Sequence, residues 1–420
     1  MKKKIIMVVT NEVITDNRVK KEAQSLSKNY SVLVLGFLRN DVKVREKVDN
    51  YKILRIKEPI LRRLFVKSKL FKSLFTVESN QGLNNKKVQR LSFMDYVGDF
   101  LQIMFLLNKS FTVFKKLTMM KADIYHANDL DTLVPCVLAA KKYGGKVIYD
   151  SHELCTEEGW VKSIFFKNMM VSIENRYINM CDDVITVNKS IAYELKNRYN
   201  LVNKPNVILN TPIQQKINEK PDKKPELMIK KQILKKNKKC LSVLFTGFLA
   251  PDRGLEEMVD ALEHVNGVHF YIRGFGTIVE SLKDRIKKLG ISKKVTFLPV
   301  VSPDKLIKLS SKYDVGIIFY RKTTLNHLYC TPNKLFEFMM SGLCILANDL
   351  PELKRFITQC KSGMVINSEK RDEIKQALEF LRDNPNKLNE FKKNSFKSGK
   401  LYTWKAEEKK LLKIYDKLNK

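Results

Sequence analysis

The sequence lacks several features that would place it in a common class. No apolar run approaches the roughly 18 residues that a membrane-spanning helix needs, so we expect no transmembrane segment. The apolar part of the start, MKKKIIMVVTNEV, ends after five residues, which favours a first β-strand over a signal peptide. The seven cysteines are scattered without a CxxC pair, so neither zinc nor disulfides are indicated and reduced thiols in the cytoplasm fit best.

The sequence also lacks the common phosphate-binding motifs of nucleotide sites and has fewer acidic than basic residues. There is no GxGxxG or GxxxxGK[ST] motif, which argues against a dinucleotide oxidoreductase and an NTPase. The chain has 45 Asp+Glu against 78 Lys+Arg, and its net charge of +33 attracts nucleic acid, anionic lipid or phosphorylated small molecules. A solvated lysine surface explains most of this excess equally well. Because no RRM or zinc-finger motif is present, we expect no nucleic-acid partner.

Two basic segments interleave bulky apolar residues with lysine or arginine. Residues 59–75 contain several basic residues and no acidic one, and residues 159–170 place Trp160 and Phe165 beside lysines. Such stretches suit a membrane interface, where they would contact anionic lipid. They suit the packed face of a helix equally well, so both interpretations stay open.

The rest of the chain alternates short apolar runs with helical patterns. A chain of 420 residues is too long for one ordinary core, so two domains are expected. The first half predicts strands at 4–10, 31–37, 122–129, 146–153, 182–188 and 206–210, with helices at 17–28, 131–142, 163–180 and 189–199. The second half predicts strands at 242–248, 268–274, 295–300, 314–320 and 343–349. This rhythm indicates two α/β units with parallel sheets, separated by the Lys- and Pro-rich segment 212–240.

The stretch TPNKLFEFMMSG, residues 331–342, predicts a short helix that binds an anion. Thr331 suits the N-cap, Pro332 the first helical position and Gly342 the position after the end. Lys334 and the N–H groups of the helix start could hold a phosphate, and Glu337 could accept from the two hydroxyls of a ribose. An ordinary surface glutamate is the alternative for Glu337.

Two other loops of the second half follow predicted strands. Gly247 lets the backbone turn, and Arg253 opens the next helix, where a positive charge does not suit the helix dipole and so indicates anion binding. Gly274 and Gly276 permit close approach of the backbone to a ligand, although a plain turn explains them equally well.

In the first half, polar side chains follow three strands, and Asp16 and Arg18 lie at the turn between the first strand and its helix. His126, Asn128 and Asp129 end one strand, and the DLD sequence superficially matches a DxD metal motif. Capping of helix 131–142 by Asn128 or Asp129 explains it as well, so we expect no metal. Asp150 and His152 end the next strand, where either histidine could donate a proton or a hydrogen bond to a sugar or serve a structural role.

Together these motifs resemble the bacterial glycosyltransferases of family 4, in their PNKLFE branch, nearly end to end. The resemblance is carried by DNRVKKEAQSL, HANDLDTLVPCVLAAKKYGGKVIYDSHEL, DDVITVNKSIAYEL, GFLAPDRGLEEMVDAL, TTLNHLYCTPNKLFEFMMSGLCILANDLPEL and TWKAEEKKLLKIYDKL. It implies the GT-B fold, with two Rossmann-like, doubly wound α/β domains facing across a cleft. Residues 1–210 would bind the acceptor and be joined by a returning helix (403–420), and residues 211–402 would bind the nucleotide-sugar.

The resemblance also assigns roles to single residues. Arg253 matches the basic residue on the donor diphosphate, and Glu337 matches the second glutamate of the EX7E pattern, which holds the ribose. The donor-binding residues it implies are Gly247, Arg253, Gly274, Gly276, Thr331, Asn333, Lys334, Leu335 and Glu337. The catalytic candidates are Arg253, Lys334, Glu337, Asn128 and His152, and those on the acceptor side are Asp16, Arg18, Asp129 and Asp150.

Three positions depart from the family pattern. Tyr329 replaces the first glutamate of the EX7E pattern, so recognition of the donor sugar must differ. Phe248 stands where many relatives carry an arginine, and Asn128 stands in place of a histidine associated with the donor sugar. A weakly active paralogue is therefore an alternative.

The resemblance implies a metal-independent, retaining hexosyltransferase without a cofactor. Its co-substrate would be a nucleotide-diphosphate sugar, with UDP favoured over GDP. Its acceptor would be a growing, lipid-linked surface glycan, such as a capsule or lipopolysaccharide precursor, met by a peripheral protein on the cytoplasmic face of the membrane. A nucleotide-sugar epimerase of the same architecture is the alternative from another class.

Overall fold

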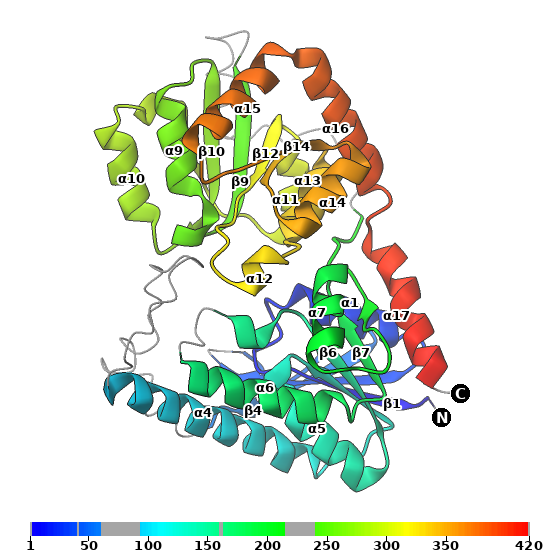
Figure 1. Ribbon diagram of the computed structural model, residues 1–420. Helices are drawn as coiled ribbons and strands as arrows, with labels where there is room; N and C mark the ends of the chain where they lie inside the picture. Colours follow the sequence, from blue (N-terminus) through cyan, green and yellow to red (C-terminus); the bar gives the residue numbers. More distant parts are fainter. Residues whose placement is uncertain (1, 40–41, 60–92, 159–162, 215–239, 419–420) are drawn as a thin grey trace. The chain divides into compact units, whose positions relative to one another are not determined.

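The computed structural model describes residues 2–39, 42–59, 93–158, 163–214 and 240–418 (Figure 1). The chain forms two compact units. Unit 1 comprises residues 1–209, 324–326 and 407–420, and unit 2 comprises residues 210–323 and 327–406. Most of the basic segment 59–75, the first part of 159–170 and most of 212–240 lie outside the described residues.

Unit 1 is a doubly wound α/β domain. Its described strands form one sheet in the order β3-β4-β2-β1-β5-β6-β7-β8, in which every pairing is parallel except β3 with β4. The elements are β1 (Lys4–Val8), α1 (Asn17–Leu26), β2 (Ser31–Leu38), β3 (Arg45–Val48), β4 (Tyr51–Lys57), α4 (Phe93–Leu117), β5 (Ile124–Asn128), α5 (Leu130–Tyr143), β6 (Lys146–Ser151), α6 (Ile164–Ile178), β7 (Asp183–Thr186), α7 (Lys189–Arg198) and β8 (Asn206–Val207). Helices α4, α5 and α6 lie together on one side of this sheet (Figure 1).

The C-terminal helix α17 (Trp404–Leu418) packs on unit 1 for most of its length. The hydroxyl of its buried Tyr415 lies 2.5 Å from His126 Nδ1 of β5, and the Tyr415 ring lies 5.7 Å from that of Tyr30. Glu407 accepts a hydrogen bond from the backbone N–H of Leu209 at 3.0 Å. These contacts explain why the apolar positions of a helix so late in the sequence face the first domain.

Unit 2 contains a second parallel sheet, in the order β11-β10-β9-β12-β13-β14. Its elements are β9 (Leu241–Leu249), α9 (Leu255–Glu263), β10 (Val268–Gly276), α10 (Val279–Lys288), β11 (Val295–Leu298), α11 (Pro303–Ser310), β12 (Val315–Ile318), α13 (Asn333–Ser341), β13 (Cys344–Asn348), α14 (Pro351–Cys360), β14 (Gly363–Ile366), α15 (Arg371–Asp383) and α16 (Pro385–Gly399). The short helix α12 (Leu325–Leu328) has residues assigned to each unit. Its apolar strands are buried on both faces, as expected for parallel strands covered by helices.

The strands and helices predicted from the sequence are present within a few residues of their expected bounds. One boundary was wrong: the N-cap of α13 is Pro332 rather than Thr331, and the first helical residue is Asn333. The helix ends as expected, because Gly342 adopts the left-handed conformation with φ of 70° just after Ser341.

Candidate functional site

A pocket of about 410 Å³ lies in unit 2 at the carboxyl ends of β9 and β10 and the start of α13. It is lined by Thr246, Gly247, Phe248, Arg253, Arg273, Gly274, Phe275, Val300, Val301, Leu306, Tyr320, Pro332, Asn333, Lys334 and Glu337. Ligands of open parallel sheets bind at this edge, so the position agrees with a nucleotide-type ligand. Of the expected donor-binding residues, six line the pocket and three do not. Those that do not are Gly276, Thr331 and Leu335.

The floor of this pocket depends on glycine. Gly247 and Gly274 are partners in the β9–β10 register, and a Cβ on Gly274 would lie 1.8 Å from the Gly247 carbonyl oxygen. Gly247 also has φ of 130°, which side chains other than glycine rarely adopt. Both positions therefore need glycine, and they leave backbone at the floor where a ligand can approach closely.

Two cations share one aromatic ring at the pocket wall. The Arg253 guanidinium carbon lies 4.2 Å from the Tyr320 ring centroid, and Lys334 Nζ lies 5.7 Å from the same ring and 4.0 Å from that of Phe245. Arg253 Nη1 is buried, makes no hydrogen bond within the described residues and lies 3.5 Å from Asp252. The aromatic faces hold the two positive charges without neutralising them, which leaves them available to an anion.

Opposing effects act on the protonation of Lys334. The side chain is only 8% exposed. Burial, followed by the charge of Arg253, lowers the pKa of Lys334 to about 7, although Glu337 on the next turn acts in the opposite direction. An anionic group placed beside Lys334 would oppose this shift and favour the charged form of the lysine.

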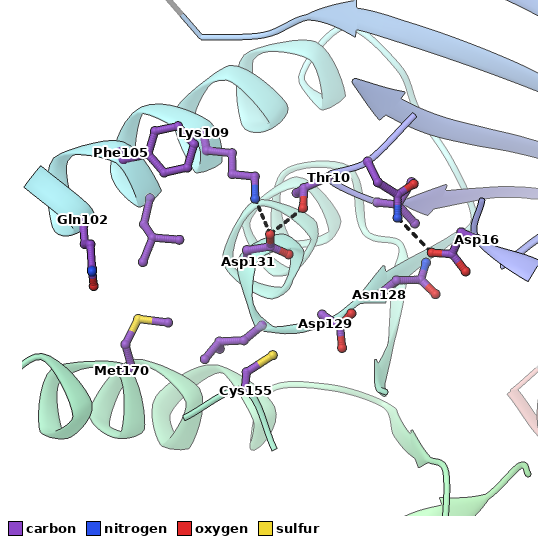
Figure 2. Close-up of a pocket in the computed structure, with 14 residues that line it drawn as sticks. Thr10, Asp16, Gln102, Phe105, Lys109, Asn128, Asp129, Asp131, Cys155 and Met170 are labelled. Carbon is purple, nitrogen blue, oxygen red and sulfur yellow. Dashed lines mark hydrogen bonds and ion pairs between the residues drawn. The ribbon is translucent and has the colours of Figure 1, made fainter. Parts of the chain in front are cut away.

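A second pocket, of about 330 Å³, lies in unit 1 (Figure 2). Its polar wall joins the ends of β1 and β5, where Asp131 accepts hydrogen bonds from Thr10 Oγ1 and Lys109 Nζ, each at 2.5 Å. Its apolar wall comes from α4 and α6, where Phe105, Leu106 and Met170 contribute. The pocket therefore suits a molecule with hydroxyl groups at one side and apolar surface at the other.

Two amide oxygens point to a hydroxyl-bearing ligand in this pocket. Gln102 and Asn128 are 6% and 3% exposed, and neither Gln102 Oε1 nor Asn128 Oδ1 has a hydrogen-bond partner within the described residues. Asn128 is held by its Nδ2, which donates to the carbonyl of Val8 at 3.0 Å. Buried acceptors of this kind cost free energy unless something donates to them, and sugar hydroxyls would do so.

Asp129 lies at the mouth of the same pocket in a strained conformation. It is the N-cap of α5, as the sequence allowed, but with φ of 62° and ψ of 167° and without a side-chain cap hydrogen bond. Its carboxylate instead accepts from the backbone N–H of His152 at 3.0 Å and lies 3.3 Å from His152 Nδ1. Such backbone strain persists at sites where a side chain must be held in one place.

His152 carries a proton between two carboxylates. Although burial disfavours the imidazolium, Asp129 and Asp150 raise the pKa of His152 to about 10. Burial, opposed mainly by His152, raises the pKa of Asp129 to about 7. The histidine side chain is 16% exposed, and the carboxylates of Asp129 and Asp150 beside its two ring nitrogens fix the orientation of the charged ring.

Arg18 and Asp150, expected on the acceptor side, lie behind the pocket. Arg18 Nε and Nη2 donate to Asp150 at 3.0 and 2.9 Å, and Nη1 donates to the carbonyl of Ile208 at 2.7 Å. Burial opposes ionisation of Asp150, but Arg18 and His152 together hold its pKa well below the usual range. Both residues are almost fully buried and neither lines the pocket, so their place on the acceptor side stays a prediction.

Glu22, His126 and Asp150 form a set that could bind a metal ion, with ligand atoms within 4.8 Å of one another. The Arg18 guanidinium already supplies positive charge there, 3.1 Å from Glu22 and 2.9 Å from Asp150. Burial, followed by the charge of Asp150, raises the pKa of Glu22 to about 8, so its carboxyl group is mostly protonated at neutral pH. We interpret this set as a structural ion-pair cluster.

Comparison with known proteins identifies this architecture. Residues 228–398 match the family model of glycosyl transferases group 1. The chain superposes end to end on sucrose-phosphate synthase from Thermosynechococcus elongatus, with a TM-score of 0.70, 12% identity and 99% of each chain covered. A glycosyltransferase from Rickettsia africae matches with a TM-score of 0.68 and 14% identity over 100% of this chain and 99% of that one. The fold is GT-B.

A third GT-B relative, Anabaena HepE in complex with UDP and glucose, matches with a TM-score of 0.65 and 14% identity over 99% of this chain and 100% of that one. No curated protein sequence matches the chain. The match to group 1 and the GT-B neighbours support a glycosyltransferase. The prediction of a GT-B fold is confirmed, whereas family 4 and its PNKLFE branch stay predictions.

Sequence reasoning missed several residues of the two pockets. It did not find Tyr320, Arg273 and Phe275 in unit 2, or Gln102, Lys109 and Asp131 in unit 1 as pocket residues. Phe275 could have been suspected, because an aromatic between two glycines at a strand end is rarely buried. It is 64% exposed and packs edge-on against Phe248 at 5.6 Å between ring centroids.

Proposed function

We propose that the protein is a retaining glycosyltransferase that moves a sugar from a nucleotide-diphosphate sugar, with UDP favoured over GDP, to a lipid-linked surface glycan. The observation that carries the proposal is the pair of cations, Arg253 and Lys334, held on aromatic rings above a glycine floor in unit 2. Two positive charges match the charge of a diphosphate, and the pocket of about 410 Å³ would also accommodate a sugar. Glu337, on the same wall, would accept hydrogen bonds from the ribose.

In the proposed reaction the protein would act mainly by stabilising the leaving diphosphate. As the bond between the anomeric carbon and the diphosphate breaks, negative charge grows on the diphosphate oxygen, and Arg253, Lys334 and the start of α13 would stabilise it. The same oxygen would accept the proton of the incoming acceptor hydroxyl on the same face of the sugar, so the configuration is retained. The two side chains would supply the positive charge that a metal ion supplies in other enzymes, so we propose that transfer needs no metal.

The acceptor would bind in the pocket of unit 1. Asn128 and Gln102 would receive sugar hydroxyls, His152 and Asp129 would orient the reacting group, and the apolar wall would accommodate the lipid-proximal part. We propose a capsule or lipopolysaccharide precursor as the glycan and the cytoplasmic face of the membrane as the location. None of the helices in the described part of the chain has the length and apolar content that a membrane crossing needs.

Calorimetric titration of the purified protein against a panel of UDP- and GDP-sugars tests the donor. Binding of one nucleotide-sugar, weakened in Arg253→Ala, is the expected result, and the absence of binding to every donor would refute the proposal. With the donor known, nuclear magnetic resonance of the product gives the anomeric configuration. Release of an epimerised free sugar without an acceptor would assign the protein to the epimerases instead.

A further inference from the structure

Helix α4 exposes a continuous row of large apolar side chains. Phe100, Met104, Leu107 and Phe111 are 61%, 39%, 58% and 66% exposed. Their spacing of four, three and four residues places all of them on one face of the helix. A soluble protein scatters exposed apolar residues singly, so a row of four indicates a contact surface.

The start of α6 extends this surface. Ile164 and Phe165 are 72% and 61% exposed, and they directly follow Ser163, whose hydroxyl donates to the carboxylate of Asp99 on α4. That hydrogen bond holds the first turn of α6 close to the residue that precedes Phe100. We call these six residues, Phe100, Met104, Leu107, Phe111, Ile164 and Phe165, the α4 stripe.

The part of α4 that follows Phe100 is basic. From Phe100 to Lys121 the sequence contains no acidic residue and four lysines, Lys109, Lys115, Lys116 and Lys121. Lys109 is engaged by Asp131, Lys115 and Lys116 lie in the last turn of α4, and Lys121 lies beyond its end. Apolar side chains flanked by lysines match a bilayer surface with anionic headgroups, and the net charge of +33 adds attraction at longer range.

The opposite face of α4 lines the pocket of unit 1. Gln102, Phe105, Leu106 and Lys109 point into that pocket, also at helical spacing (Figure 2). One helix, with a diameter of about 10 Å, therefore separates the pocket from the α4 stripe. An acceptor whose lipid remains in the bilayer could reach the pocket around this helix without leaving the membrane.

We infer that the α4 stripe is the surface by which the protein docks on an anionic lipid bilayer, with α4 as the element that brings the acceptor pocket to the membrane. The inference rests on the proposed function for the identity of the acceptor, but the docking surface itself is defined by α4 and α6. The occupant is a lipid surface rather than a second copy of the chain, because the lysines that flank the stripe would repel their own copies.

Sedimentation with vesicles tests the inference. The full-length protein is mixed with vesicles of equal parts phosphatidylglycerol and phosphatidylcholine, or of phosphatidylcholine alone. The wild type should bind the anionic vesicles, and Leu107→Glu/Phe111→Glu should bind them about tenfold or more weakly, since two large apolar groups no longer enter the bilayer. The matched control, Val44→Glu/Val202→Glu, makes the same charge change at exposed apolar positions of unit 1 and should bind within about twofold of wild type.

Three results would overturn the inference. The wild type could fail to bind anionic vesicles. Alternatively, both double variants could lose binding equally, which would mean that the net charge of the protein, and not the α4 stripe, causes binding. Ultracentrifugation could also show a wild-type dimer that Leu107→Glu/Phe111→Glu converts to a monomer, which would make the stripe a dimer interface. Nucleotide-sugar binding is measured with the same preparations, because neither pair of substitutions touches the pocket of unit 2. A variant that keeps this binding is folded, and a wild type that lacks it counts against the proposed function but not against docking on the bilayer.

Discussion

The protonation of Lys334 should couple donor binding to pH. In the free protein the pKa of this lysine is about 7, because burial and Arg253 both disfavour its charge. In the proposed complex a bound diphosphate would lie beside the ammonium group and should raise that pKa well above 8. Binding then takes up about 0.9 proton at pH 8 and about 0.1 proton at pH 6, and the affinity should be about tenfold lower at pH 8 than at pH 6.

Calorimetry in buffers of different ionisation enthalpy measures this proton uptake. A nucleotide-diphosphate sugar is the right ligand, since it lacks the terminal phosphate of free UDP, whose second ionisation lies near pH 6. Lys334→Met should abolish both the uptake at pH 8 and the pH dependence of affinity between pH 6 and 8. Lys293→Met, at an exposed position of unit 2, is the matched control and should behave as wild type. Proton uptake that survives in Lys334→Met would show that another group titrates and would refute the reasoning.

Substitutions at three residues separate the roles of the site residues. Glu337→Ala should weaken binding of a nucleotide-sugar about tenfold but leave binding of an analogue without ribose hydroxyls unchanged, whereas an equal loss for both ligands would remove the ribose role. Arg253→Ala should lower kcat about 10²-fold, and Arg253→Lys should recover only part of it because it cannot pack flat on Tyr320; wild-type turnover would contradict the assignment. Asp129→Gly should have a higher Tm than Asp129→Ala, because both lose the carboxylate but only glycine relieves about 1–2 kcal/mol of backbone strain, and transfer should fall in both.

Much of the fold could be predicted because its signals are local. Apolar runs such as 242–248 and 268–274 form strands that are mostly buried on both faces. The residues between them carry helical periodicity, so these strands and helices could be predicted from the sequence. Helix α4 was not predicted, because apolar residues occur on every side of it: some line a pocket, some pack on α5 and four face outward. The antiparallel strand β3 was missed since its REKV sequence has no apolar run.

The candidate donor site was predictable only in part, for a physical reason. Gly247, Arg253, Lys334 and Glu337 belong to loops and helix starts at strand ends, and parallel strands bring such positions to one edge. The ring that supports both cations, Tyr320, ends a different strand, and nothing in its neighbours marks it as a partner of Arg253. Sequence spacing likewise cannot show that Arg18 pairs with Asp150, which is 132 residues away.

The arrangement of the two cations favours the leaving group over the bound donor. Arg253 lowers the pKa of Lys334 in the free protein, which means that the two charges repel each other when nothing lies between them. In the proposed reaction a donor diphosphate would relieve that repulsion with two negative charges, and the charge that grows on the leaving oxygen before it takes the acceptor proton would relieve it further. Stabilisation therefore grows along the reaction, which is the condition for raising kcat rather than only tightening binding. Neutral hydrogen-bond donors at the same two positions would bind the donor without this gain, so the burial of Lys334 on Phe245 and Tyr320 would itself serve the proposed transfer.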